Sequence, residues 1–198
     1  MLDLNKDGKG DCHARDPCKF TDVVRFTKID MKRIFDNQLD RGPALNILNI
    51  GGGTGLLSFL LWKAFGHHVD TCDIPSVAFQ YDGHYPVMAS FFGITKRHWF
   101  ITNVTTASPP SWLGTYDVVL IYWSVFNKFW DPQGHKDFLM ALLPHIAPGG
   151  LVHWESNNFP GATEYHSVTF RYPELIAIAN ESGRTIPFQR YKHEENNT

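Results

Sequence analysis

The chain has 198 residues, of which 43% are hydrophobic, and a formal net charge of −2 at neutral pH. This length favours one domain with a sizeable core. A near-neutral balance without a long Lys/Arg run argues against a surface that tracks nucleic-acid phosphates, and the longest apolar runs are far below the roughly 20 residues that span a bilayer. We therefore expect neither a nucleic-acid nor a membrane partner.

The amino-terminal segment is polar. Residues 1–19 are rich in Asp, Lys and Gly and predict a flexible lead. Oxygen-bearing side chains between Asp3 and Asp11 follow the first half of an EF-hand calcium loop, but Ala14 stands where that loop needs Glu. A flexible lead is therefore preferred over a calcium site, and no metal site is predicted. The start lacks the basic and apolar regions of a signal peptide, and the three cysteines lack metal-ligand spacing, which together indicate a cytoplasmic protein with reduced thiols.

Apolar periodicity predicts the elements that follow. Helical spacing indicates an amphipathic helix within residues 20–41. A strand at 47–50, a helix at 56–65 and a second strand at 68–72 come next, which is the order of a βαβ unit. The second helix is apolar nearly all round, as expected for one that packs against a sheet.

Beyond this unit, helices and strands continue to alternate. The predicted helices cover residues 85–92, 136–146 and 173–182, and the predicted strands cover residues 99–103, 116–123, 151–155 and 186–191. This alternation predicts an α/β protein with a doubly wound, mostly parallel sheet flanked by helices. A single domain then covers residues 20–191, and residues 192–198 are expected to be a disordered tail.

Four glycines lie in the turn between the first strand and its helix, at Gly51, Gly52, Gly53 and Gly55. A dinucleotide-binding turn has glycines at its first, third and sixth positions, the last of which permits close packing of helix on strand. The sixth position here is Leu56. A dinucleotide-dependent oxidoreductase is therefore disfavoured, and the turn suits the approach of backbone to a smaller, less anionic ligand.

Four segments resemble class I S-adenosylmethionine-dependent methyltransferases. They are LNIGGGTG at 48–55, Asp73 at the end of the second strand, YDVVLIYW at 116–123 and LLPHIAPGGLVHWESN at 142–157. The similarity runs from about residue 45 to 157, with a weaker continuation to 191, and is closest to a poorly characterised subgroup of that class. It implies the Rossmann-like methyltransferase fold and S-adenosyl-L-methionine as cofactor. The short segment after the fifth strand predicts that the final antiparallel hairpin of this fold lacks a member.

The resemblance also implies a set of cofactor-binding residues. Asp73 stands where the family places the carboxylate that binds the ribose hydroxyls, and Asn103 stands where an acidic residue often meets the adenine amine. Asn49 replaces the family's acidic residue before the glycine turn, and thereby removes a negative charge. The full set is Asn49, Gly51, Gly52, Gly53, Gly55, Asp73, Ile74, Asn103, Val104 and Tyr122.

Two further residues are candidates for catalysis. Glu155 lies near the carboxyl end of the fifth strand, where a carboxylate could act as general base or only orient its neighbours. Asn127 follows the fourth strand, where this class builds its acceptor pocket. The leading hypothesis is a methyltransferase that acts on a small molecule or a sugar hydroxyl. The alternative is a catalytically silent binding or interaction module that keeps the fold.

Overall fold

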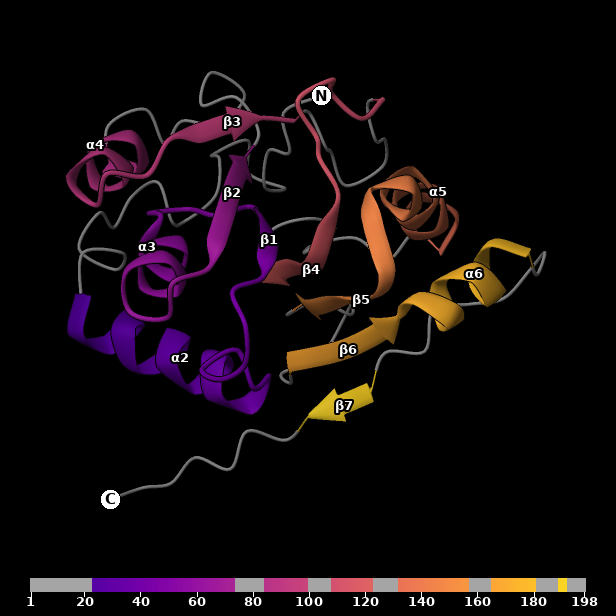
Figure 1. Cartoon of the computed structure of the whole chain (residues 1–198), viewed down its shortest axis with the longest axis horizontal. Coiled ribbons are helices and arrows are strands. Elements are labelled where there is room, and N and C mark those ends of the chain that lie inside the picture. The colour runs from indigo at the N-terminus through magenta and orange to yellow at the C-terminus, as the bar shows by residue number, and fades with distance from the viewer. Residues whose placement is uncertain are drawn as a thin grey trace, which may run out of the picture.

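The computed structural model describes residues 23–73, 84–99, 108–122, 132–156, 165–180 and 189–191. Its strands form one seven-stranded sheet in the order β3-β2-β1-β4-β5-β6-β7 (Figure 1). The first five are mutually parallel, and β6 runs antiparallel to both of its neighbours. The strands are β1 Asn46–Ile50, β2 His68–Asp73, β3 Lys96–His98, β4 Tyr116–Tyr122, β5 Ile146–Ser156, β6 Tyr165–Arg171 and β7 Gln189–Tyr191.

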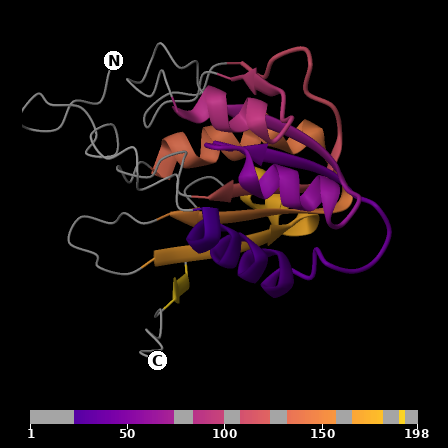
Figure 2. The ribbon, with the colours of Figure 1, turned by 90° about the vertical axis from the view of Figure 1, so that its left-hand side faces the viewer.

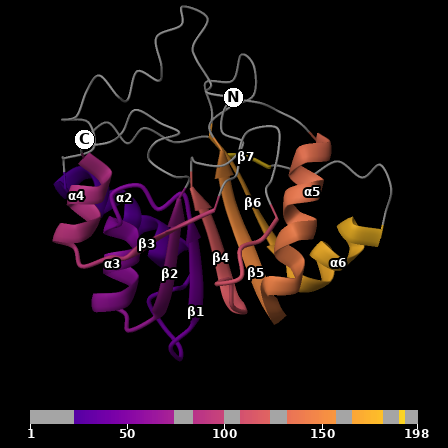
Figure 3. The same ribbon diagram turned by 90° about the horizontal axis from the view of Figure 1, so that it is seen from above.

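Helices cover the sheet from both sides. Viewed from above, α2 and α3 lie on one side of the strands, and α5 and α6 lie on the other (Figure 3). The order reverses at β1, where one half of the sheet continues to β2 and the other to β4, so the connecting helices fall on opposite faces. This confirms the predicted doubly wound α/β class. The helices are α2 Val23–Asp36, α3 Leu56–Lys63, α4 His84–Phe91, α5 Pro132–Leu142, the 3₁₀ turn η3 Leu143–His145 and α6 Tyr172–Asn180.

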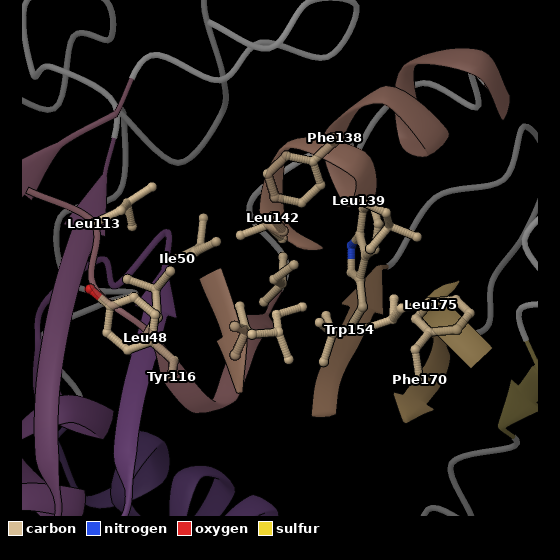
Figure 4. Packing of buried hydrophobic residues seen from close by; sticks show 14 of the residues in the cluster. Leu48, Ile50, Leu113, Tyr116, Phe138, Leu139, Leu142, Trp154, Phe170 and Leu175 are labelled. Carbon is tan, nitrogen blue, oxygen red and sulfur yellow. The ribbon is translucent and has the colours of Figure 1, made fainter. Parts of the chain in front are cut away.

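Each face of the sheet has its own apolar core, because side chains of a strand alternate between faces. On the α5/α6 face, the Phe138 ring packs edge-on against Trp154, with centroids 5.5 Å apart (Figure 4). Both of these side chains are fully buried. On the opposite face, Leu120 of β4 packs with Ile34 of α2 and Leu61 of α3. The buried hydrophobic runs of β1 and β4 therefore supply both cores at once.

Helix α2 is part of the second core. Ile34 has no exposed surface, whereas Val24 on the same helix is 69% exposed, which is the amphipathic pattern that the sequence predicts. A buried Asp30 lies on the apolar face. Among the described residues, no helix is both long and apolar enough to cross a membrane.

Two strand predictions are corrected. The strand expected at 99–103 lies instead at Lys96–His98, although the Trp99 N–H still donates to Asp73 O at 3.1 Å. The fifth strand begins at Ile146 rather than residue 151, because the Pro148-Gly149-Gly150 segment is an irregular part of β5 with Gly149 at φ +87°. A turn sequence can lie in a strand where a register shift absorbs it.

The prediction that the final antiparallel hairpin lacks a member is wrong. Strand β6 lies between β5 and β7 and pairs with both (Figure 2). Its sequence alternates Val168 and Phe170 with the exposed Thr169 and Arg171, which is the pattern of a strand with one buried face. This alternation was the signal for an additional strand. The edge strand β7 confirms the end of the strand predicted at 186–191.

Candidate functional site

The glycine turn connects the carboxyl end of β1 to α3, next to the carboxyl end of β2. The N–H groups of Gly51 and Gly52 both donate to Cys72 O, at 2.8 and 3.2 Å. Gly51, Gly53 and Gly55 all have positive φ, in the left-handed region that side chains other than glycine rarely adopt. Alternate glycines therefore let the chain fold back over the end of β2 before Leu56 starts the helix.

Gly52 is required for a different reason, which is close approach. Its φ lies outside the left-handed region, but a Cβ at this position would come within 2.3 Å of Thr71 Cγ2. The turn thus packs directly on the side chain of the neighbouring strand. By contrast, a Cβ at Gly53 would meet no atom of the described residues closer than Gly51 O at 3.9 Å, so the described part of the chain leaves this side of the turn uncovered.

A buried polar row lies beneath the turn. Asn49 Nδ2 donates to Ser58 Oγ at 2.9 Å, and Thr71 Oγ1 donates to the same oxygen at 2.7 Å. All three side chains are buried. The row ties β1, β2 and α3 together, so the structure gives Asn49 a contact within the protein. An amide suits this place because a carboxylate would carry a buried charge that needs a cationic partner.

Asp73 lies at the end of β2, against the turn. Its Oδ2 accepts the Gly53 N–H at 3.1 Å and is 2.9 Å from Lys96 Nζ. Lys96 Nζ also donates to Gly53 O at 2.7 Å. The side chains of Lys96 and Asp73 are only 15% and 19% exposed. The predicted ribose carboxylate is therefore brought beside the predicted glycines, as expected, with a lysine that the sequence did not indicate.

Tyr122 and Glu155 come together in a second cluster, built with α2. Arg33 Nε and Nη2 both donate to Glu155 Oε2, at 3.2 and 2.8 Å, and Arg33 Nη1 donates to Asp30 Oδ1 at 3.1 Å. The guanidinium carbon lies 4.2 Å from the centre of the Tyr122 ring, a cation–π contact. Asn37 Nδ2 donates to Tyr122 Oη at 3.3 Å. One arginine thus links the amino-terminal helix to the carboxyl ends of β4 and β5.

His153 completes this cluster on the same face of β5 as Glu155. Its Nδ1 is 2.7 Å from Thr169 Oγ1, and its ring centre is 5.5 Å from that of Tyr122. His153 Nε2 lies 3.8 Å from Glu155 Oε1, which is beyond hydrogen-bond length. Arg33 is therefore the main partner of the Glu155 carboxylate.

Burial and charge act in opposite directions on the acids of this cluster. Burial raises the pKa of Asp30 to about 6, although the Arg33 charge opposes the shift. Burial alone would also raise the pKa of Glu155, but the contacts of that carboxylate with His153 and Arg33 hold it below its ordinary value. A carboxylate with a low pKa is a weak proton acceptor at neutral pH. The ion pair with Arg33 therefore argues against the predicted general-base role of Glu155. Burial also raises the pKa of Tyr122 well above its ordinary value, so its phenol stays protonated.

Four of the predicted site residues lie outside the described residues: Ile74, Asn103, Val104 and Asn127. The Asp3–Asp11 segment, considered for calcium, lies outside them as well. Within the described part of the chain, no group of three or more His, Cys, Asp or Glu side chains could hold a metal ion.

Two cations of these clusters are not among the predicted site residues. Lys96 precedes the strand predicted at 99–103, whereas in the structure it begins β3. Arg33 carries a detectable signal: Asp30, Arg33 and Asn37 are spaced three and four apart, and so lie on the helix face that also holds Ile34. Polar residues on the apolar face of a helix indicate buried partners on the sheet.

We expect Gly52→Ala to lower the free energy of unfolding by about 1–3 kcal/mol, the usual cost of overpacking. Thr71→Ser removes the clashing methyl group while retaining the hydroxyl that bonds Ser58. The double variant G52A/T71S should therefore be more stable than G52A alone, as measured by chemical denaturation. If T71S fails to rescue G52A, the packing of the turn on Thr71 is not the cause of the loss.

Asp30 should make stability depend on pH. Between about pH 4 and 6 the folded protein retains the Asp30 proton, whereas the unfolded chain has lost it at its ordinary pKa of 3.8. The free energy of unfolding therefore falls as pH rises through this window, by up to about 3 kcal/mol for a shift of about two pKa units. Thermal unfolding of the wild type and D30N from pH 4 to 7.5 measures this. The Tm of D30N minus that of the wild type should increase with pH, and a constant difference would contradict the assignment.

Comparisons with known proteins identify the fold. No protein-family model matches the chain, and no curated protein matches its sequence. The PH0226 protein from Pyrococcus horikoshii OT3 aligns with a TM-score of 0.51 and 14% identity, over 80% of this chain and 82% of that protein. The plantazolicin methyltransferase BpumL, in complex with SAH, aligns with a TM-score of 0.47 and 20% identity, over 75% of this chain and 55% of its own.

Coclaurine N-methyltransferase, bound to N-methylheliamine and SAH, aligns with a TM-score of 0.46 and 16% identity over 65% of this chain. The chain spans 35% of that enzyme and about half of BpumL. At these identities the likenesses show the fold alone. That fold is the Rossmann-like, doubly wound α/β fold.

Proposed function

We propose that this chain binds S-adenosyl-L-methionine and transfers its methyl group to a small-molecule or sugar acceptor. The observation that carries the proposal is the contact between Gly53 and Asp73. It places a carboxylate at the carboxyl end of β2 directly beside a glycine turn at the carboxyl end of β1. In doubly wound sheets, ligands bind outside these ends, where the strand order reverses.

The residues present suit an adenosyl group. A ribose offers two adjacent hydroxyls as donors, and a carboxylate has about four acceptor positions. Asp73 can therefore keep its contacts with Gly53 and Lys96 and also accept from a ribose. Among the described residues no side chain covers the turn at Gly53, which supports an approach of its backbone to the ligand. Ile74, Asn103 and Val104 stay predictions for the same site.

The chemistry that this proposal needs is mainly positional. When bound, S-adenosylmethionine would supply an electrophilic methyl group on a sulfonium. Holding an acceptor in line with that group provides most of the rate in such a displacement. A general base is optional, so the weak basicity of Glu155 is compatible with transfer. Asn127 stays a prediction on the acceptor side.

Calorimetric titration with S-adenosylhomocysteine, the demethylated product, tests cofactor binding directly. We expect saturable binding by the wild type. D73N keeps the shape but removes the charge that strengthens hydrogen bonds from the ribose, so its affinity should fall about 10- to 100-fold. D36A, at an exposed site on α2, is the control and should bind as the wild type does. The absence of binding by folded wild-type protein at high micromolar ligand would refute the proposal.

A silent binding module is the second candidate, and the Arg33–Glu155 ion pair favours it, because the predicted base is held as a paired carboxylate. Incubation with S-adenosylmethionine that is radiolabelled in its methyl group, together with pooled small-molecule metabolites, separates the two. A methyltransferase should yield labelled product, and D73N should yield less of it. Tight cofactor binding without labelled product from any metabolite fraction would favour the silent module.

A further inference from the structure

Lys96 connects three strands at the proposed cofactor site. It belongs to β3, where its backbone is in register with Thr71 of β2, and Thr71 is in register with Asn49 of β1. The Lys96 side chain reaches across β2 to the turn that follows β1. It thus ends where the glycine turn and Asp73 meet.

Lys96 and Asp73 together contact both peptide groups of Gly53. The ammonium group donates to Gly53 O at 2.7 Å and lies 2.9 Å from Asp73 Oδ2. The same Oδ2 accepts from the Gly53 N–H at 3.1 Å. Carbonyl, ammonium, carboxylate and N–H therefore form a closed ring of contacts around one glycine. Gly53 has φ +51°, and among the described residues a Cβ at this position would lie within 4 Å of Gly51 O alone, so polar contacts rather than side-chain packing at Gly53 hold its peptide groups.

We propose that Lys96 is a positioning residue for cofactor binding, which holds the Asp73 carboxylate and the Gly53 peptide in the orientation that receives the ribose. This inference rests on the proposed function. Because the Lys96 ammonium group occupies one side of Oδ2, the carboxylate cannot rotate freely about its Cβ–Cγ bond. A hydrogen-bond acceptor with a fixed direction binds a diol more tightly than one that must be ordered on binding.

The low exposure of the pair strengthens this interpretation. At 15% and 19% exposure, Lys96 and Asp73 are screened less by solvent than a surface ion pair, and their geometry is correspondingly more constrained. The Lys32–Asp36 pair on α2 differs, because its side chains are 66% and 58% exposed. Lys32 therefore offers a matched control, in which a lysine is removed from an ion pair on the helix surface.

The test measures whether Lys96 strengthens the contribution of the ribose hydroxyl to binding affinity. Wild type, K96M, K96R and K32M are titrated with S-adenosylhomocysteine and with its 2′-deoxyribose analogue. In the wild type, loss of the hydroxyl should weaken binding about 10-fold. In K96M, binding of S-adenosylhomocysteine should itself weaken about 10-fold, and the additional loss with the analogue should fall below about 2-fold, because an unoriented carboxylate gains little from the hydroxyl. K96R retains the charge and should lose less than K96M, and K32M should match the wild type.

The outcomes separate the two proposals. If the wild type binds neither ligand, the proposed function fails. If the wild type binds S-adenosylhomocysteine and K96M shows the same penalty for the 2′-deoxyribose analogue, the positioning role is refuted, because Lys96 then stabilises the protein without acting on the ribose. Thermal unfolding of each variant shows which are folded at the titration temperature. If K96M is not folded at that temperature, K96R is compared with the wild type in its place. The 2′-deoxyribose analogue should then lose less affinity, relative to S-adenosylhomocysteine, in K96R than in the wild type.

Discussion

The packing of the glycine turn on Thr71 is the constraint on which the rest of the site depends. A side chain at position 52 would overlap the Thr71 methyl group, so only glycine lets the chain lie this close to β2. That closeness allows two N–H groups of the turn to share Cys72 O and a third to reach the Asp73 carboxylate. Beneath it, Thr71 and Asn49 both bond Ser58, which sets the start of α3 against the two strands. Thr71 thus takes part in both the close packing of the turn and the buried polar row.

The two carboxylates that the sequence singles out share a physical requirement. Asp73 and Glu155 are both mostly buried, and each is paired with a cation from another element, Lys96 of β3 and Arg33 of α2. A buried carboxylate needs such a partner to remain ionised. The consequences differ for function. At Asp73 the cation is proposed to orient a ligand-binding group, whereas at Glu155 the contacts with His153 and Arg33 outweigh burial, lower the pKa of the carboxylate and make it a weaker base.

Helix α2 has a larger role than an amphipathic helix needs for packing alone. Ile34 anchors it in the core with α3, and Arg33 bonds Asp30 on the same helix and Glu155 on the sheet. The guanidinium also covers the Tyr122 ring. Burial of apolar side chains holds the helix against the sheet, and the polar contacts of Arg33 set its position over the ends of β4 and β5. The residue predicted to contact cofactor, Tyr122, is therefore held through α2.

Local sequence patterns are enough to predict the fold class and the place of the glycine turn. Apolar runs with periods of two and 3.6 residues, interrupted by glycine, are local properties, so the alternation of helices and strands and the position of Asp73 after β2 could be predicted. The strand at Tyr165–Arg171 is not among the predicted elements, although its sequence alternates. The third strand begins three residues before its predicted start, because a strand of three residues carries little pattern.

Which side chains contact one another depends on how the chain folds as a whole. The contacts of Lys96 with Gly53, 43 residues away, and of Arg33 with Glu155, 122 residues away, depend on strand register and helix docking, which no local pattern encodes. The same holds for Asn49, which stands where the resembled family has an acidic residue. Its amide donates to the buried Ser58 Oγ, a contact that explains why an uncharged residue suits this position. Burial sets the cost of a charge, and burial is a property of the assembled fold.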